Sequence, residues 1–308
     1  MPQLLGRRAA AATAALAASV LLAAGCASNP ATSAGSGGGG SSPTAGSGSS
    51  DPKALVPADV KSKGTLIIAA DASYAPNEFF DTDGKTIIGM DVDLATALGT
   101  ELGLKVQMQN VTFDSIISGL ASSKYDLGMS SFTDTKKREQ TVDFVTYFSA
   151  GSSLMVKAGN PEGLKPNDLS LCGKKLAVEK GTIQESGDIP ADTAACRTAG
   201  KPAVTGLSFD DQNGANLALS SGRADGVLAD SPVAAYAAKQ SSGAFVITGA
   251  PYGTAPYGIA IPKGNGMAPA VLAGLKALIA DGQYTKIMTK WGIQDGAITN
   301  PVINGATS

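Results

Sequence analysis

Residues Phe113 to Tyr147 read FDSIISGLASSKYDLGMSSFTDTKKREQTVDFVTY, and this is the most informative segment of the chain. Residues 113–121 carry apolar side chains at helical spacing and predict a helix. Lys124-Tyr125-Asp126 follows and leads into a short apolar run, residues 127–129, which predicts a buried strand. The strand is followed by hydroxyl residues and a single arginine: Ser130, Ser131, Thr133, Thr135 and Arg138.

Hydroxyls, exposed backbone amides and an arginine at the end of a strand form a site suited to a small carboxylate. Arginine can donate to both carboxylate oxygens at once, which lysine cannot do. A second polar segment, DASYAPNEFFDTDGKTIIGMDVDLA, occupies residues 71–95 and follows another apolar strand pattern, TLIIAA, at 65–70.

Strand and helix patterns alternate along the whole body of the chain, which predicts an α/β fold with mainly parallel sheets flanked by helices. We expect strands at 65–70, 105–111, 127–129, 151–157, 176–179, 226–229 and 257–261. We expect helices at 91–102, 113–121, 210–220, 231–239, 267–281 and 283–291. Asp91 is a candidate N-cap, and Pro232 suits the first turn of its helix.

The pattern of helix, turn and strand occurs twice. SSKYDLG at 122–128 and SSGRADGVL at 220–228 both place a basic residue and an aspartate before a short apolar strand. We interpret this as two similar α/β lobes and not as a tandem repeat.

These segments resemble the polar amino-acid-binding proteins of bacterial ABC importers, the family-3 solute-binding proteins. The resemblance implies a two-lobed periplasmic-binding-protein-like fold with two hinge crossings, near residues 150–151 and 251–252. Lobe 1 would comprise residues 61–150 plus 252–295, and lobe 2 residues 151–251. Ligands of open α/β sheets bind beyond the carboxyl ends of the strands, so the site is expected in the cleft between the lobes.

The resemblance also assigns the ends of an amino-acid zwitterion. Arg138 matches the carboxylate-binding arginine, Thr133 a hydroxyl residue that touches both ends, and Ser131 a backbone acceptor for the ammonium group. Thr182, in the segment GTIQE, matches a residue that caps the carboxylate, and Asp230 matches the ammonium-binding aspartate. The alternatives are a solvated helix charge for Arg138 and a helix N-cap for Asp230.

The side-chain pocket is assigned in the same way. Tyr74 and Phe113 match aromatic residues that sandwich the ligand, with core packing as the alternative. Asp71 matches a cleft-facing residue, and its carboxylate would favour a cationic or amide side chain over an acidic one. Asn77 departs from the family's usual phenylalanine, and Gln212 and Asn213 are further candidates that the sequence does not rank.

The N-terminal segment, residues 1–25, has the pattern of a secretion signal: Arg7 and Arg8 precede the apolar run 9–24. LLAAGCAS resembles a lipoprotein cleavage box, which would make Cys26 the lipidated first residue, although Ala23 stands where leucine is usual. The alternative is an ordinary secretory signal and a chance cysteine. Residues 26–52, rich in Gly and Ser, predict a flexible tether, with an r.m.s. reach of about 25–30 Å for 24 such residues.

Composition excludes several classes of function. Histidine is absent, which excludes His-based triads and His metal sites, and no metal-ligand spacing or cofactor motif occurs. The net charge of −2 argues against nucleic acid as a partner. Cys172 and Cys196 form an even pair in an exported chain, which favours a disulfide over two free thiols.

We therefore expect a binding protein and not an enzyme: a monomer held on the outer face of the cell membrane, which hands an amino acid to the transmembrane subunits of an ABC permease. One alternative is a ligand-sensing module. The other is a cyclohexadienyl-dehydratase-like enzyme on the same fold, for which Glu78 and Glu179 are the obvious acids.

Overall fold

The computed structural model describes residues 51–307. The predicted signal segment, Cys26 and nearly all of the predicted tether lie outside these residues. The last two tether residues fall within them, where Asp51 caps the helix that begins at Pro52. No helix within residues 51–307 is both long and apolar enough to cross a membrane.

The first half of the described chain alternates short strands and helices as expected. Its elements are α1 (Pro52–Leu55), α2 (Ala58–Lys63), β1 (Thr65–Ala70), β2 (Ser73–Tyr74), β3 (Glu78–Phe80), β4 (Ile87–Ile88), α3 (Met90–Leu102), β5 (Lys105–Asn110), α4 (Phe113–Ala121), β6 (Leu127–Gly128) and β7 (Val142–Lys157). A short 3-10 helix, Arg138–Gln140, precedes β7.

The second half repeats the alternation. Its elements are β8 (Lys175–Glu179), α5 (Ile189–Thr198), β9 (Thr205–Phe209), α6 (Gln212–Ser220), β10 (Gly226–Asp230), α7 (Ser231–Gln240), β11 (Phe245–Pro262), α8 (Ala268–Ala280) and α9 (Gln283–Trp291). A single π-helical turn, Gln184–Asp188, leads into α5, and Pro232 lies in the first turn of α7 as predicted.

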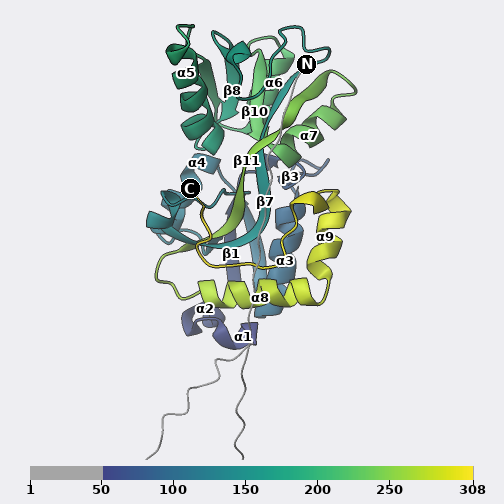
Figure 1. The fold of residues 1–308 in the computed structure, drawn as a ribbon. Coiled ribbons are helices and arrows are strands. Elements are labelled where there is room, and N and C mark those ends of the chain that lie inside the picture. Colours follow the sequence, from purple (N-terminus) through teal and green to yellow (C-terminus); the bar gives the residue numbers. More distant parts are fainter. Residues whose placement is uncertain (1–50, 308) are drawn as a thin grey trace, which may run out of the picture. The chain divides into compact units, whose positions relative to one another are not determined.

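One mixed sheet of eight strands runs through the described residues in the order β5-β1-β6-β11-β7-β10-β8-β9, and β2, β3 and β4 form a separate small sheet. The β5-β1-β6 group and the β10-β8-β9 group are parallel, whereas β7 and β11 pair antiparallel at the centre. Figure 1 shows β7 and β11 side by side between the helices α3, α8 and α9 and the helices α5, α6 and α7. The expected α/β class is confirmed.

The strands β7 and β11 are far longer than predicted. The sequence predicts strands at 151–157 and 257–261, but the structure carries them over Val142–Lys157 and Phe245–Pro262. Register shifts near residues 248–255 let β11 stay paired to β7 through its glycine- and proline-rich middle. Mutual pairing along their length overrides the weak strand propensity of SAGSS and GAPYGTAPYG.

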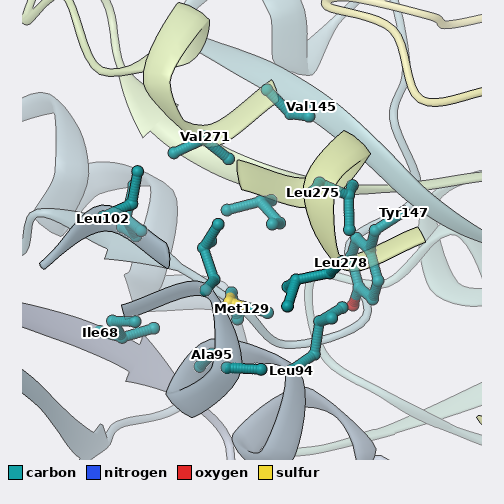
Figure 2. Packing of buried hydrophobic residues seen from close by; sticks show 14 of the residues in the cluster. Ile68, Leu94, Ala95, Leu102, Met129, Val145, Tyr147, Val271, Leu275 and Leu278 are labelled. Carbon is teal, nitrogen blue, oxygen red and sulfur yellow. The ribbon is translucent and has the colours of Figure 1, made fainter. Parts of the chain in front are cut away.

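The largest apolar cluster packs α3 and α8 against β1, β6 and β7. Figure 2 shows Ile68, Leu94, Met129, Val145 and Leu275 converging there, and all five side chains are fully excluded from solvent. This packing fixes the end of β6, and therefore the polar loop that follows it, on a rigid base.

The expectation that Asp91 caps a helix is wrong. α3 begins one residue earlier, with Gly89 at its N-cap, and Asp91 lies inside the first turn, completely buried. Its Oδ2 accepts a hydrogen bond of 2.9 Å from the backbone N–H of Ser131, so Asp91 supports the loop after β6.

The predicted disulfide joins Cys172 to Cys196, with an S–S distance of 2.04 Å. It ties the segment before β8 to α5, and the cysteines pack with Leu171 and Val204 in an apolar cluster.

The C-terminal segment runs along β7. Ala297 and Ile303 form isolated bridges to Phe148 and Val145. Further on, the backbone N–H of Gly305 donates to Asp134 and that of Ala306 to Glu139, at 2.8 and 3.1 Å. The segment thereby reaches the loop that carries Arg138.

Candidate functional site

A small cavity lies where the loop after β6 meets the carboxyl ends of β8 and β10. Its lining includes seven of the eight predicted ligand residues: Tyr74, Phe113, Ser131, Thr133, Arg138, Thr182 and Asp230. Ile183 and Gln184 complete it. The cavity measures about 10 Å³, close to the space that one water centre requires. An amino acid therefore enters only if the walls move apart.

Two buried carboxyl groups hold the loop after β6. The Ser130 hydroxyl donates to Glu78 at 2.9 Å, and Ser131, with a φ of 53°, donates its backbone N–H to Asp91. Burial, followed by the charge of Asp91, raises the pKa of Glu78 well above its usual value, and burial raises the pKa of Asp91 to about 6. The Ser131 hydroxyl also lies 3.3 Å from Glu78 Oε2 and 3.4 Å from Asp91 Oδ2, so the two acids share this serine. The pair therefore retains a proton at a pH where surface carboxyls are ionised.

Arg138 is not a solvated surface charge. Its side chain is half-buried, with Nη1 donating to the carbonyl of Thr133 at 2.7 Å and Nη2 to the carbonyl of Gly181 at 2.9 Å. The guanidinium carbon lies 5.5 and 5.3 Å from the ring centroids of Phe113 and Phe132. Burial lowers the pKa of Arg138 to about 10, so it remains charged at neutral pH.

Asp230 ends β10 and stands at the N-cap of α7, but its side chain makes no cap hydrogen bond. Instead, Oδ2 accepts from the Tyr257 hydroxyl at 2.6 Å and Oδ1 from Gln184 Nε2 at 2.7 Å. Its backbone N–H donates to the Tyr74 hydroxyl at 3.1 Å. Burial raises the pKa of Asp230, and these bonds oppose the rise.

The Gly-Thr turn after β8 forms the wall opposite Arg138. The Thr182 hydroxyl donates to the carbonyl of Glu179 at 2.7 Å, and the Gly181 N–H donates to Glu185 Oε2 at 2.7 Å. Lys180 forms an ion pair with Asp114 of α4 at 2.8 Å. The turn is therefore fixed by its own hydrogen bonds, attached to α4 through Lys180, and joined to the loop after β6 through Arg138.

Tyr74 and Phe113 line the cavity and also pack in the interior. Tyr74 is 6% exposed and belongs to the apolar cluster around β10 and α6. Phe113 stacks on Phe132 with ring centroids 4.4 Å apart. Both interpretations of these aromatic residues therefore apply, because each residue lines the cavity and also packs in the core.

Asp71 is the predicted ligand residue that the structure does not bring into the cavity lining. It lies at the end of β1, 5% exposed, where Oδ2 accepts a hydrogen bond of 3.0 Å from the backbone N–H of Phe113. Burial raises its pKa. Asp71 therefore contacts the backbone of Phe113, a residue that lines the cavity.

Sequence reasoning missed Gln184 and Tyr257, which both hold Asp230. Gln184 has a usable signal, since it stands two places after Thr182 in the GTIQE segment. Tyr257 has none, because it lies 27 residues beyond Asp230 and reaches it only through the pairing of β11 with β7 and of β7 with β10.

The cavity thus has a fixed cation on one wall and a fixed carboxylate on another, with hydroxyl groups of Ser131, Thr133 and Thr182 around it. Such a set matches the opposite charges of a zwitterion. Nothing in it forms a nucleophile and general-base pair, and no group of three or more metal-binding side chains occurs within residues 51–307.

A family model described as bacterial extracellular solute-binding proteins, family 3, matches residues 66–294. The chain is 35% identical over 252 residues to the arginine-binding protein ArgT of Corynebacterium glutamicum, a match that covers 82% of each chain. It is 32% identical over 216 residues to the ABC transporter glutamine-binding protein GlnH of Bacillus subtilis, covering 68% of this chain and 75% of that one.

A solved structure of an ancestral arginine-binding protein bound to arginine superposes with a TM-score of 0.68 at 36% identity. The match covers 74% of this chain and 98% of the other. The structural neighbours are two-lobed periplasmic binding proteins, so the predicted two-lobed architecture is confirmed.

Proposed function

Because the chain belongs to the bacterial extracellular solute-binding proteins of family 3, we propose that it binds a polar L-amino acid and delivers it to the permease of an ABC importer. The family and the relatives described above are amino-acid-binding proteins and not enzymes. We propose a side chain that is cationic or an amide, which agrees with the arginine and glutamine named for those relatives.

The observation that carries this proposal is the cavity shared by Arg138 and Asp230. Arg138 would bind the ligand carboxylate, with Thr133 and Thr182, and Asp230 would bind the ammonium group, with Ser131. The guanidinium is oriented by Thr133 and Gly181, and the carboxylate by Gln184 and Tyr257. Such preorganised groups bind more tightly, because little ordering remains to be done when the ligand arrives.

We propose that residues 61–150 plus 252–295 form one lobe and residues 151–251 the other, with hinges where β7 and β11 cross. Arg138 then belongs to the first lobe, and Thr182 and Asp230 to the second. A ligand that contacts both lobes favours the closed form by no more than its difference in affinity between the two forms. The small volume of the cavity supports the proposal that the two lobes close around the ligand.

We also propose that residues 1–25 are a signal peptide, that Cys26 is lipidated and that residues 26–52 tether a monomeric body to the outer face of the membrane. A diacylglycerol group supplies enough buried methylenes for stable anchoring, which a single short chain does not.

Isothermal titration of the purified protein with the twenty L-amino acids tests the function. The protein should first be unfolded and refolded to remove any ligand carried through purification. We expect a subset with cationic or amide side chains to bind. Binding of acidic amino acids alone would contradict the proposed preference, and binding of none would contradict the zwitterion site.

Arg138→Ala tests the carboxylate clamp. Truncating one partner of a buried charged pair costs about 2–5 kcal/mol, so affinity should fall at least about 30-fold. Lys137→Ala is the control, because Lys137 is an exposed neighbour of Arg138 and its substitution also removes one positive charge. Equal affinities for the two variants would refute the role of Arg138.

A further inference from the structure

Four polar residues outside the cavity lining meet where the ends of β1, β8 and β9 approach one another. Glu179 is the last residue of β8 and pairs in register with Phe209, the last residue of β9. α6 starts just beyond, at Gln212, whose backbone N–H donates to the Ser73 hydroxyl at 3.0 Å. Asp71 lies two residues before Ser73, and interaction with Ser73 opposes the rise that burial causes in the pKa of Asp71. Residues from both proposed lobes therefore come together here.

This group has more acceptors than donors. Glu179 is 2% exposed and Gln212 is 1% exposed, and the Oε1 atom of each lacks a hydrogen-bond partner within the described residues. The charged groups that act most strongly on Glu179 are Asp71, Asp230 and Asp211, and all three are acidic. Buried acceptors left unpaired among like charges are costly, so the arrangement suits a cationic donor from outside.

The titration behaviour agrees with this geometry. Burial, and then the charges of Asp71 and Asp230, raise the pKa of Glu179 well above its usual value. A buried acid among like charges keeps its proton until a cation takes the proton's place.

The position is right for the side chain of a ligand. Thr182 lines the cavity and donates its hydroxyl to the backbone carbonyl of Glu179 at 2.7 Å, so Glu179 directly adjoins the cavity. The charges of the cavity residue Asp230 and of Glu179 also act on each other. Asp71 adjoins the cavity through its hydrogen bond to Phe113. An amino acid held at its zwitterionic end by Arg138 and Asp230 would direct its side chain past these residues toward Glu179.

We infer that Glu179 is the residue that selects a guanidinium side chain, which it binds together with Asp71 and the amide oxygen of Gln212. This inference rests on the proposed function and names the ligand class of the same site. A guanidinium group carries five N–H donors in a fixed plane and no acceptor, so it can serve several oxygens at once. A carboxamide offers two donors and no charge, so it leaves the two acids without a cation.

Glu179→Gln tests the inference, because it removes the charge and keeps the size of the side chain. Isothermal titration with L-arginine and with L-citrulline, which has the same length but no charge, measures the selectivity. We expect the variant to bind arginine about 10- to 100-fold more weakly, with citrulline affinity changed by less than about threefold. Glu162→Gln is the matched control, since it removes an exposed carboxylate that pairs with Lys174 and should change neither affinity.

Asp71→Asn is a second variant, for use if Glu179→Gln does not fold. It removes the charge of the other acid in the pair that Glu179 and Asp71 form. An amide oxygen at position 71 can still accept from Phe113, so the same loss of selectivity is expected. Unchanged arginine affinity in these variants, or equal losses for arginine and citrulline, would overturn the inference and leave the proposed function standing. Tighter binding of citrulline or glutamine than of arginine by the wild-type protein would also overturn the inference and leave the proposed function standing. Failure of the wild type to bind any amino acid would overturn both.

Discussion

Gly181 offers a test of closure that leaves the ligand contacts themselves in place. It follows β8, has a φ of +82°, and lies against α4: a Cβ atom added there would be 2.9 Å from the Cβ of Asp114 and 3.0 Å from its Cα. Both neighbouring atoms are close to the backbone of α4 and cannot swing aside. Gly181→Ala should therefore hold the two walls of the cleft apart.

The substitution carries two separate costs. An L-residue in the left-handed region costs about 1–2 kcal/mol, and this strain is present whether the cleft is open or closed. In the proposed closure of the cleft, the contact with Asp114 is made only in the closed form, and overpacking of this kind typically costs about 1–3 kcal/mol. Only the second cost weakens binding, so amino-acid affinity should fall by about 5- to 150-fold.

Gly200→Ala separates the two costs. Gly200 has a φ of +67° and no atom within 4 Å of its added Cβ, so it suffers the same backbone strain without the contact. Denaturant unfolding should show both variants destabilised to a similar degree, and titration calorimetry should show weaker binding in Gly181→Ala alone. If Gly181→Ala binds as tightly as Gly200→Ala, the two walls do not meet at Asp114 in the bound form.

The remaining predictions concern stability. Replacing both Cys172 and Cys196 by alanine removes a cross-link between residues 24 positions apart in the sequence. The free energy of unfolding, measured by denaturant titration, should fall by about 3 kcal/mol. A loss below about 1 kcal/mol would contradict this chain-entropy account. Burial, and then Asp188, raise the pKa of Asp192 to about 6, above its unfolded value of 3.8, so its carboxyl group lowers stability as pH rises through this window. Asp192→Asn should therefore stabilise the protein by about 1–2 kcal/mol at pH 7 and by almost nothing at pH 4, and a gain of equal size at both pH values would argue against titration of Asp192.

Elements with one strong local signal could be predicted from the sequence. The helix expected at 113–121 has those bounds in the structure, because an amphipathic run there starts after a turn and ends at a pair of serines. The strands β7 and β11 could not be predicted in full, because Gly, Ser and Pro in their middle signal turns. Their pairing joins residues about a hundred positions apart, and no local pattern reports it.

The candidate site divides in the same way. Residues of one contiguous motif, such as Ser131, Thr133 and Arg138, could be predicted together because one loop positions them all. Tyr257 and Asp91 could not, since each reaches the site only through tertiary packing. Asp71 was correctly placed at a strand end, but the sequence does not show that its carboxyl group accepts from the backbone of Phe113 and stays outside the cavity lining.

The C-terminal segment has a consequence for how this molecule is delimited. The family match ends at residue 294, yet Gly305 is the backbone donor that opposes the rise in the pKa of Asp134, which burial brings to about 6. A version that ends at residue 294 would lack Gly305. Asp134, which lies four residues before Arg138, would then lose this hydrogen bond. The smallest piece that retains a native binding loop is therefore longer than the piece that alignment identifies.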